Sequence, residues 1–479
     1  MTLRRWFDRW VGLDDAVAYT LAARLLNILS STGTVLLILH FFSPLEQGYY
    51  YTMLSLVALQ MIFELGFSFV ILQLAAHESA HLTLHPDGRV EGDAAAHARL
   101  ASVLQLTARW YLCAAAGLAA ILLPLGTLLF SRHNAHGAAD AGAHVAWPGP
   151  WAAAVLAIAL SFLLTPLISF LEGANHVRRV ARARMHQALV GMVLSWGAIA
   201  SGHGLYAPAM VNLGWAAVGA ALLFSRRRLL MGLMRYQAGI HSVSWRKEVW
   251  PFQWKIAVSW LASYLSLQIF TPILFVFRGP LEAGRMGLSL SIVTYIPFLA
   301  LCWITPKAAP FGRLVTLGRI GELDATFIRA LKQSFALASA IAALCLIGVI
   351  LMQRLLPGIA ARMESAGIFV LLVAAAVGSF LVQGLAVYLR SFKREPYLVQ
   401  SLGTAALTTA LALLAVRRWG SLAIAADYFV ISGVIGLAWA AAIFHRSRMS
   451  SLRAHNAKAP SCRPALLPAT RQMGGSYGL

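Results

Sequence analysis

Stretches of about twenty mostly apolar residues recur along the whole chain, separated by short polar connections. Such a stretch crosses the roughly 30 Å hydrocarbon core of a bilayer as an α-helix, and a helix satisfies its own backbone hydrogen bonds there. Hydrophobic residues make up 59% of the sequence and charged residues only 12%, a balance that excludes an ordinary soluble domain. We count about twelve spans, over residues 18–41, 49–74, 104–130, 150–172, 184–202, 205–225, 254–277, 286–305, 329–352, 366–389, 395–416 and 421–445.

The sequence therefore predicts an all-α polytopic membrane protein. The net charge of +21 does not indicate a nucleic-acid-binding protein, because the charges lie between apolar runs instead of forming a basic domain. Lysine and arginine are scarce in the connections that follow odd-numbered spans and abundant in the others, as in "NHVRRVARAR" and "SRRRLL". The positive-inside rule then predicts a multi-pass protein of the plasma membrane with both termini in the cytoplasm.

The sequence P-L-E-x-G occurs twice, as Pro44–Gly48 and Pro280–Gly284, with an offset of 236 residues. Leu54, Ser55 and Val57 match Leu290, Ser291 and Val293 at the same offset. An even number of spans separates the copies, which predicts two parallel repeats of six helices. We expect the motif to form the turn after the first helix of each repeat, with Pro and Gly supplying the turn geometry and Glu46 and Glu282 capping the next helix.

The predicted organisation follows from this repeat. It consists of an N-terminal six-helix lobe over residues 1–225, a cytoplasmic linker over 226–253, a C-terminal six-helix lobe over 254–445, and a basic, disordered cytoplasmic tail over 446–479.

Polar residues follow one helical face in several spans, at spacings of three and four. Polar groups are costly in lipid, so an aligned stripe predicts a cavity or a partner helix. We interpret the stripes as the lining of a polar cavity between the two lobes; the alternative is ordinary helix–helix contact. The stripes are Arg24, Asn27, Ser31 and Thr34; Gln60, Glu64 and Ser68; Lys255, Ser259, Ser263 and Ser266; and Tyr397, Ser401, Thr404 and Thr408.

Three cations, Arg24, Arg109 and Lys255, fall in the predicted cytoplasmic half of their spans. A cavity with these charges suits an anionic head group, because guanidinium groups match phosphate oxygens. The alternative is that each side chain extends to the lipid interface. Glu64 lies at a depth where it could pair with Arg24.

The acidic residues Asp427 and Glu64 are the candidates for a proton or sodium site. For Asp427 the alternative role is an ion pair with Arg417 or Arg418.

No catalytic or metal-binding pattern is present in the sequence. The four cysteines lack metal-ligand or redox spacing. The histidines in "SRHNAHGAADAGAHVAWPGP" are separated by flexible Ala and Gly residues, which favours a solvated loop over a metal site. The sequence therefore predicts no cofactor.

Four segments carry a resemblance to a known family: "LHFFSPLEQGYYYTMLSLVALQMIFELGFSFVILQLAAHE", "FLEGANHVRRVARARMHQ", "GPLEAGRMGLSLSIV" and "WITPKAAPFGRLVTLGRIGELDATFIRALKQS". They resemble bacterial oligosaccharide flippases (Wzx-like) of the multidrug/oligosaccharidyl-lipid/polysaccharide exporter superfamily, over residues 20–440. The resemblance implies two six-helix lobes in a MATE-like V that opens alternately to either side. It also implies cationic cavity residues for a lipid diphosphate. Arg24 matches this expectation, but Trp260 occupies the equivalent position of the second repeat.

The resemblance makes a flippase for an undecaprenyl-diphosphate-linked oligosaccharide in the bacterial inner membrane the leading hypothesis. Its partners would be membrane lipid and a polysaccharide polymerase or glycosyltransferases. A cation-coupled multidrug exporter of the same architecture is the first alternative, although Arg24 opposes cationic drugs. The second alternative, a membrane glycosyltransferase or polymerase, usually presents catalytic acids on a large outer loop, and the longest such loop here contains one Asp. We therefore expect a transporter and not an enzyme.

Overall fold

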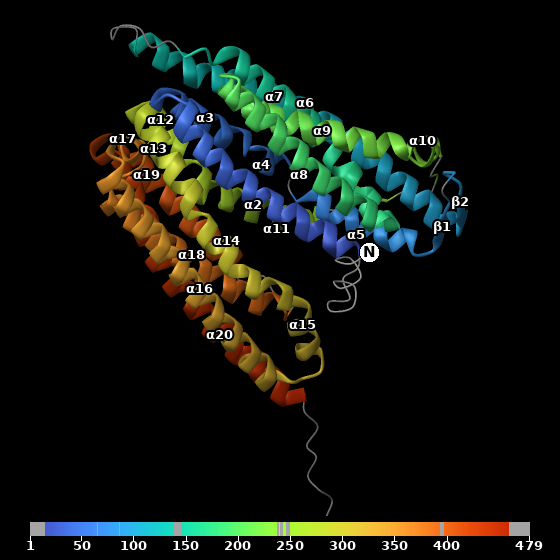
Figure 1. Cartoon of the computed structure of the whole chain (residues 1–479). Coiled ribbons are helices and arrows are strands. Elements are labelled where there is room, and N and C mark those ends of the chain that lie inside the picture. Colours follow the sequence, from blue (N-terminus) through green and yellow to red (C-terminus); the bar gives the residue numbers. More distant parts are fainter. Residues whose placement is uncertain are drawn as a thin grey trace, which may run out of the picture.

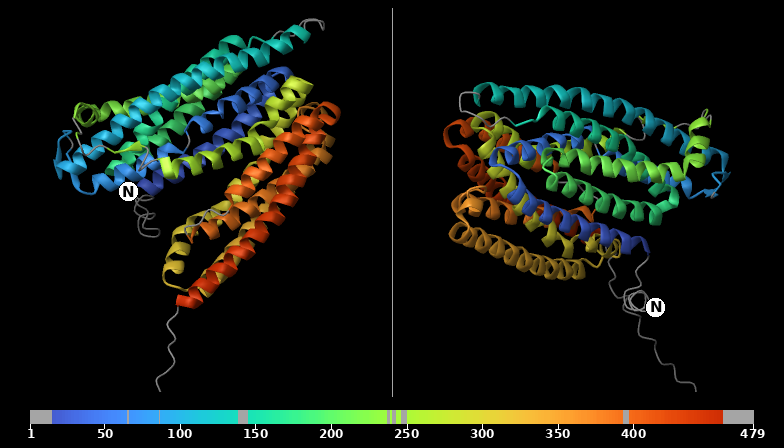
Figure 2. Two further views of the ribbon diagram at one scale, coloured as in Figure 1. Left: turned by 180° about the vertical axis from the view of Figure 1, so that it is seen from behind. Right: turned by 45° about the horizontal axis from the view of Figure 1, so that its top comes forward.

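The computed structural model describes residues 15–64, 66–85, 87–137, 145–236, 239, 243–245, 250–392 and 397–458. Its helices form two arms that meet at one end and diverge toward the other, so that the molecule has the outline of a V (Figure 1). We call the end where α3 and α13 meet the apex, and the opposite end the mouth. The N-terminal helix begins, and the C-terminal helix ends, on the mouth side (Figures 1 and 2).

The first half of the chain forms one arm. Its elements are α2 (Asp15–Phe41), α3 (Pro44–Val57), α4 (Gln60–Glu64), α5 (Phe67–Ser79), β1 (Leu82–Leu84), β2 (Val90–Gly92), α6 (Ala94–Gly137), α7 (Pro148–Leu171), η1 (Glu172–His176), α8 (Val177–Ala200), η2 (Gly204–Tyr206), α9 (Ala207–Ser225) and α10 (Arg227–Arg235).

The second half forms the other arm, although α11 also contacts α4 and α5 of the first half. Its elements are α11 (Trp250–Ser263), η5 (Tyr264–Gln268), α12 (Phe270–Arg278), α13 (Pro280–Val293), α14 (Tyr295–Ala300), η6 (Leu301–Trp303), η7 (Thr305–Lys307), α15 (Ala308–Thr316), α16 (Ile320–Leu355), α17 (Pro357–Ala360), α18 (Ala366–Arg390), α19 (Leu398–Asp427), η8 (Tyr428–Ile435) and α20 (Gly436–Lys458).

The predicted class, an all-helical polytopic membrane protein, is confirmed. Within the described residues, eight helices are long and apolar enough to cross a membrane, or ten if each of two bent pairs is one span. Two of the eight, Pro148–Ala200 and Leu398–Met449, contain 53 and 52 residues, far more than one crossing needs. Each has a backbone break, at Asn175 and at Gly420, and each covers two of the predicted spans. Taken as two crossings each, they bring the count to the twelve expected.

Three regions contain more structure than the sequence predicted. The strands β1 and β2 pair antiparallel, with Leu82 opposite Gly92 and Leu84 opposite Val90. The predicted linker packs on α6: the Gln105 side chain donates hydrogen bonds to three carbonyl groups at the end of α10, and Trp245 packs on Phe67 and Trp110. The first residues of the predicted tail continue α20 as far as Lys458.

The repeated motif lies where the two halves cross at the apex. A Cβ on Gly48 would be 2.0 Å from the carbonyl oxygen of Pro280, and one on Gly284 would be 2.9 Å from the nitrogen of Gly48. Three residues further on, Gly287 packs against Tyr51. Because Gly284 and Gly287 are the repeat equivalents of Gly48 and Tyr51, α3 and α13 meet through equivalent residues. This pairing is what two parallel repeats related by an axis along the membrane normal would produce.

The predicted capping role of the motif holds for one copy. Ser43 and Glu46 form a capping box at the start of α3, in which the Ser43 N–H donates to Glu46 Oε2 at 2.8 Å and the Glu46 N–H donates to Ser43 Oγ at 3.2 Å. In the second copy, Glu282 instead forms an ion pair with Arg278, at 2.9 Å. Each copy of the motif therefore begins a helix, α3 or α13, but the glutamates of the two copies make different contacts.

Aromatic side chains from both halves pack behind this crossing. Tyr49 of α3 lies 5.0 Å from Phe275 of α12, and Phe130 of α6 lies 5.3 Å from the same ring, measured between ring centroids. Edge-to-face pairs of this kind stabilise a contact beyond the apolar area that they bury. The apex is thus a packed interface, which fixes how the two arms are joined.

Candidate functional site

The polar stripe predicted for the first span lies on α2, and its N-terminal part lines a cavity of about 410 Å³ between α2, α7, α8 and α9. Arg24 and Asn27 lie on its α2 wall, and Arg184 and Gln187 lie on its α8 wall. Ser161 and Thr165 of α7 add hydroxyl groups, and no acidic side chain is among the described residues that line it. This cavity, which we call the Arg24 pocket, is therefore polar and positively charged.

The walls of the Arg24 pocket are held by hydrogen bonds between their helices. Ser161 donates to Asn212 Oδ1 at 3.2 Å, and Asn212 in turn donates to the Pro208 carbonyl at 2.8 Å. Gln187 donates to the Trp215 carbonyl at 3.0 Å. These bonds couple α7 and α8 to α9, so the polar groups have fixed positions.

Arg184 is partly neutralised by Glu172, whose carboxylate lies 2.6 Å away. Arg24 forms no ion pair within the part of the chain that the structure describes. Its exposed guanidinium is therefore the uncompensated positive charge of the pocket.

The C-terminal part of the same stripe, Ser31 and Thr34, makes helix contacts and does not line the cavity. Ser31 donates a hydrogen bond back to the Asn27 carbonyl at 2.7 Å, within its own helix. Thr34 accepts a hydrogen bond from the Trp196 indole at 3.0 Å, and Gly33 lies directly under the same indole ring. The stripe thus combines both interpretations weighed from the sequence: a cavity near Arg24, and a contact with α8 near Thr34.

A second cavity, of about 670 Å³, lies within the other half. The stripe of Ser259 and Ser263 in α11 and Ser266 in η5 lines it together with the stripe of Tyr397, Ser401 and Thr404 at the start of α19. Trp260 lies on the same wall, at the repeat position of Arg24. Ala23, Arg24 and Asn27 correspond to Ser259, Trp260 and Ser263, so each half has a cavity against the same part of its first helix. The described residues that line each of these two cavities come from one half only.

Arg109 and Glu64 are not among the described residues that line either cavity. Arg109 is exposed on α6, and the side chain of Lys255 lies outside the described residues. Glu64 is half-buried at the end of α4, beside Ser68, and no ion pair connects it to Arg24 in the described part of the structure. These positions stay predictions.

Asp427 is buried at the end of α19, with 8% of its surface exposed, and neither carboxylate oxygen has a hydrogen-bond partner. The suggested alternative partners are engaged elsewhere: Arg417 lies over the Phe277 ring at 4.9 Å and Arg418 over the Trp419 ring at 5.7 Å. An ionised carboxylate buried without a partner is costly. The geometry therefore leaves Asp427 available for a proton or a cation.

A network at the apex was not anticipated from the sequence. Arg362, between α17 and α18, donates to the Ile38 and Leu39 carbonyls at 3.1 Å each and to the Phe42 carbonyl, and so caps the end of α2. Gln47 donates to the carbonyls of Gly284 and Arg362, at 2.9 and 3.0 Å. The only signal in the sequence was that Arg362 is one of the few cations at that end. The residues of this network connect the two halves.

Beside this network, Glu364 is buried with one carboxylate oxygen unpartnered, and its backbone N–H donates to Ser289 Oγ at 3.1 Å. Burial raises the pKa of Glu364 to about 7; the Glu282 carboxylate adds to the rise, whereas a hydrogen bond with Ser421 and the charge of Arg285 oppose it. A titratable acid is therefore buried two residues after Arg362, the side chain that reaches the end of α2.

No family model matches the sequence, and no curated protein matches it significantly. Several solved structures are similar to this chain. The MATE multidrug transporter DinF-BH, solved with a bound ligand, is 14% identical, with a TM-score of 0.56 over 91% of this chain and 95% of that one. The lipid II flippase MurJ in an inward closed conformation is 14% identical (TM-score 0.49, 92% of each chain). A MOP-superfamily transporter from Pyrococcus furiosus is 12% identical (TM-score 0.47, 93% and 97%). The likeness to DinF-BH carries the conclusion that this chain has a MATE-like fold.

Proposed function

We propose that this protein is a transporter that moves a lipid-diphosphate-linked oligosaccharide from the cytoplasmic to the outer leaflet of the bacterial inner membrane, for surface polysaccharide assembly. The observation that carries the proposal is the arrangement of two arms joined at the apex and separate at the mouth, with the positively charged Arg24 pocket against α2. Such an arrangement suits alternating access, in which the arms rock about a site between them.

The charge of the pocket favours an anionic cargo. Arg24 presents a guanidinium group that forms no ion pair among the described residues, and guanidinium groups bind phosphate oxygens with two parallel hydrogen bonds. The hydroxyl, amide and tryptophan groups in both cavities, such as Ser263, Gln383 and Trp215, suit sugar hydroxyls and ring faces. The diphosphate would therefore bind near Arg24 and the sugars in the remaining polar space, while the lipid tail stays between the arms.

The membrane orientation belongs to this proposal. The connections that are poor in lysine and arginine lie at the apex, and most basic segments lie toward the mouth. By the positive-inside rule the mouth faces the cytoplasm, so the present conformation would accept cargo from that side.

Energy coupling is the role that we assign to Asp427, with Glu64 as a second candidate. Both are acidic residues inside membrane-crossing helices, and Asp427 has no partner among the described residues. Intramembrane acids of this kind mark ion or proton pathways. They are also the observation that favours the second candidate function, a cation-coupled exporter of cationic drugs.

A complementation experiment distinguishes the two candidates. A strain lacking the gene receives the wild-type chain, Arg24→Glu, or Arg329→Glu, which changes an exposed arginine of α16 outside both cavities. Surface glycan and the lipid-linked intermediate in the cytoplasmic leaflet are measured, with the amount of protein in the membrane as a control. We expect Arg24→Glu to lower surface glycan about tenfold or more and to accumulate the intermediate, since it reverses the charge that binds the diphosphate.

Full glycan export by the Arg24→Glu variant would remove Arg24 from the site. Unchanged glycan in the deletion strain together with altered drug sensitivity would instead support the exporter.

A further inference from the structure

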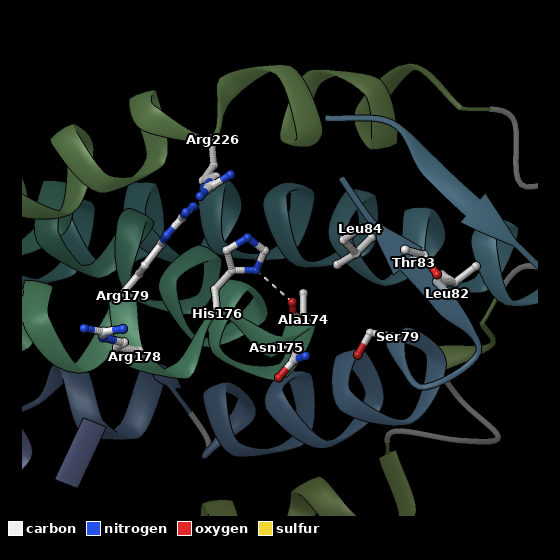
Figure 3. Close-up of a pocket in the computed structure, with 10 residues that line it drawn as sticks. All are labelled: Ser79, Leu82, Thr83, Leu84, Ala174, Asn175, His176, Arg178, Arg179 and Arg226. Carbon is white, nitrogen blue, oxygen red and sulfur yellow. Dashed lines mark hydrogen bonds between the residues drawn. The ribbon is translucent and has the colours of Figure 1, made fainter. Parts of the chain in front are cut away.

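A separate cavity of about 460 Å³ lies at the mouth end of the first half, outside the Arg24 pocket. It is formed where the end of α5, the hairpin strand β1, the turn between α7 and α8, and the end of α9 come together (Figure 3). Its described lining residues are Ser79, Leu82, Thr83, Leu84, Ala174, Asn175, His176, Arg178, Arg179 and Arg226. None of them is acidic, so the cavity, which we call the Arg179 pocket, is strongly basic.

Two guanidinium groups converge in the Arg179 pocket without a counterion. Arg179 of α8 and Arg226 at the end of α9 point toward each other, with His176 beside them (Figure 3). Neither forms an ion pair with another described residue, and the buried Nε of Arg226 has no hydrogen-bond partner. Like charges at close range repel each other. The arrangement is therefore incomplete without an anion between them.

The carboxylates that could neutralise the pocket are already paired with other arginines. Glu78 binds Arg99 at 2.8 Å, and Glu172 binds Arg184 at 2.6 Å. On the hairpin, Asp87 binds Arg89 at 2.7 Å. The side chains that the structure describes thus leave the positive charge of Arg179 and Arg226 uncompensated.

The backbone at the pocket adds to its attraction for an anion. Helix α8 begins at Val177 without a side-chain cap and without an acidic residue in its first turn, where Arg178 and Arg179 stand instead. The N-terminus of a helix carries partial positive charge and unpaired N–H groups, so cations there are unfavourable and an anion is favourable.

The turn before α8 is held in an uncommon conformation. Asn175 has φ 62°, the only positive φ of a described residue other than glycine. Strained backbone of this kind recurs at ligand sites. The turn is fixed because Gly173 packs on the backbone of α5 and Ser79 donates to the Gly173 carbonyl at 3.1 Å.

We propose that the Arg179 pocket binds a phosphate group, carried either by a lipid headgroup or by a soluble phosphate ion. The two guanidiniums would each donate to phosphate oxygens, while His176 donates its Nδ1–H to the Ala174 carbonyl at 2.8 Å, which holds the ring beside them. Leu82 and Leu84 supply apolar surface beside the charges, which fits the start of an acyl chain. This site is distinct from the Arg24 pocket and does not depend on the proposed cargo.

The test measures binding to the purified full-length protein in neutral detergent by native mass spectrometry. The probes are phosphatidylglycerol, diacylglycerol as its phosphate-free counterpart, and inorganic phosphate. We expect phosphatidylglycerol or phosphate to bind and diacylglycerol not to bind. The pair Arg179→Gln/Arg226→Gln should weaken that binding about tenfold or more, equivalent to about 1.4 kcal/mol.

The control pair, Arg182→Gln/Arg227→Gln, removes the same charge from neighbouring positions outside the pocket, one exposed on α8 and one stacked on Phe224. Binding of phosphatidylglycerol but not of inorganic phosphate would identify a lipid headgroup as the source, and the reverse would identify a soluble ion. If the pocket double variant and the control double variant bound phosphatidylglycerol and inorganic phosphate with equal affinities, the proposal would be overturned. Thermal unfolding of both pairs shows that a loss of binding is not a loss of fold.

Discussion

At the residue scale, the side chains of the apex network have roles that their sequence context did not reveal. Arg362 was visible only as a cation in a poorly charged connection, yet its guanidinium binds three carbonyl groups at the end of α2. Arg24 was predictable, because an arginine inside an apolar span requires a polar environment. Ser31 and Thr34 share its helical face, and only the structure shows that they contact their own helix and Trp196. Periodicity predicts which residues share a face, but not what covers that face.

Arg362→Lys should open the apex, because an ammonium group cannot donate to three carbonyls from the planar fork that arginine provides. We expect the closed form to lose about 1–3 kcal/mol, the usual cost of unsatisfied hydrogen bonds to a charged group. Spin labels on α10 and α15 report the width of the mouth through their distance distribution. The background variant has serine at Cys113, Cys302, Cys345 and Cys462. An unchanged distribution would show that the capping of α2 does not hold the arms together.

The conformation should also depend on pH through Glu364. Its pKa is raised from an ordinary value of 4.5 to about 7 while it is buried at the closed apex, and hydration on opening would return the pKa toward 4.5. Between these values the closed form binds more protons than the open form, so it is stabilised at low pH and loses at most about 3 kcal/mol as the pH rises through 7.

The same spin-label pair checks this expectation between about pH 4 and pH 8, a range that includes both pKa values. The fraction with a wide mouth should fall as the pH rises, and Glu364→Gln, which stays neutral, should keep it constant. A pH response of equal size in the Gln variant would assign it to another group.

At the scale of elements, the helix pair α3 and α13 determines how the two arms meet. The motif predicted a turn and a cap at the start of each helix, and the capping box of Ser43 and Glu46 bears this out for the first copy. The contact between Gly48 and Gly284 was not predictable, since close approach of two backbones depends on the relative placement of distant segments. The docking of the linker on α6 through Gln105 was not predictable for the same reason.

Gly48→Ala should force α3 and α13 apart, because its Cβ would lie 2.0 Å from the Pro280 carbonyl oxygen. Overpacking of this kind costs about 1–3 kcal/mol, so we expect a lower thermal unfolding temperature and a narrower mouth distribution. Gly348→Ala is the matched control: nothing lies within 4 Å of its new methyl group, and alanine is the better helix former by about 0.5–1 kcal/mol. If Gly48→Ala were as stable as Gly348→Ala, the crossing would not be tightly packed.

At the scale of the whole molecule, the sequence predicted the fold class through the lengths of its apolar runs. The expectation of parallel repeats came from the P-L-E-x-G motif, the matches that continue past it, and the even number of spans between the two copies. The sequence did not predict that each half has its own cavity, because it gives the depth of a residue but not the neighbouring helix that encloses it. The α11 and α19 stripes do come together around one cavity. Arg24 and Ser259, which were expected to share a chamber, line different ones.

The predicted orientation can be checked with reporter fusions. A fluorescent protein fused after residue 479 should fold and fluoresce, and alkaline phosphatase at the same site should be inactive, because the positive-inside rule places this end in the cytoplasm. Phosphatase inserted after Ala360, in α17 at the apex, should be active. The opposite pattern would mean that the mouth opens to the outside of the cell in the present conformation.

The crossing of α3 and α13 has one further consequence. A surface that meets its own repeat equivalent is isologous, as in a symmetric dimer. Two separate copies of a half-length ancestor could associate through the same glycine faces, before any fusion of their genes. Joining them end to end would then have preserved an existing contact and freed each copy to diverge elsewhere, as the difference between Arg24 and Trp260 illustrates.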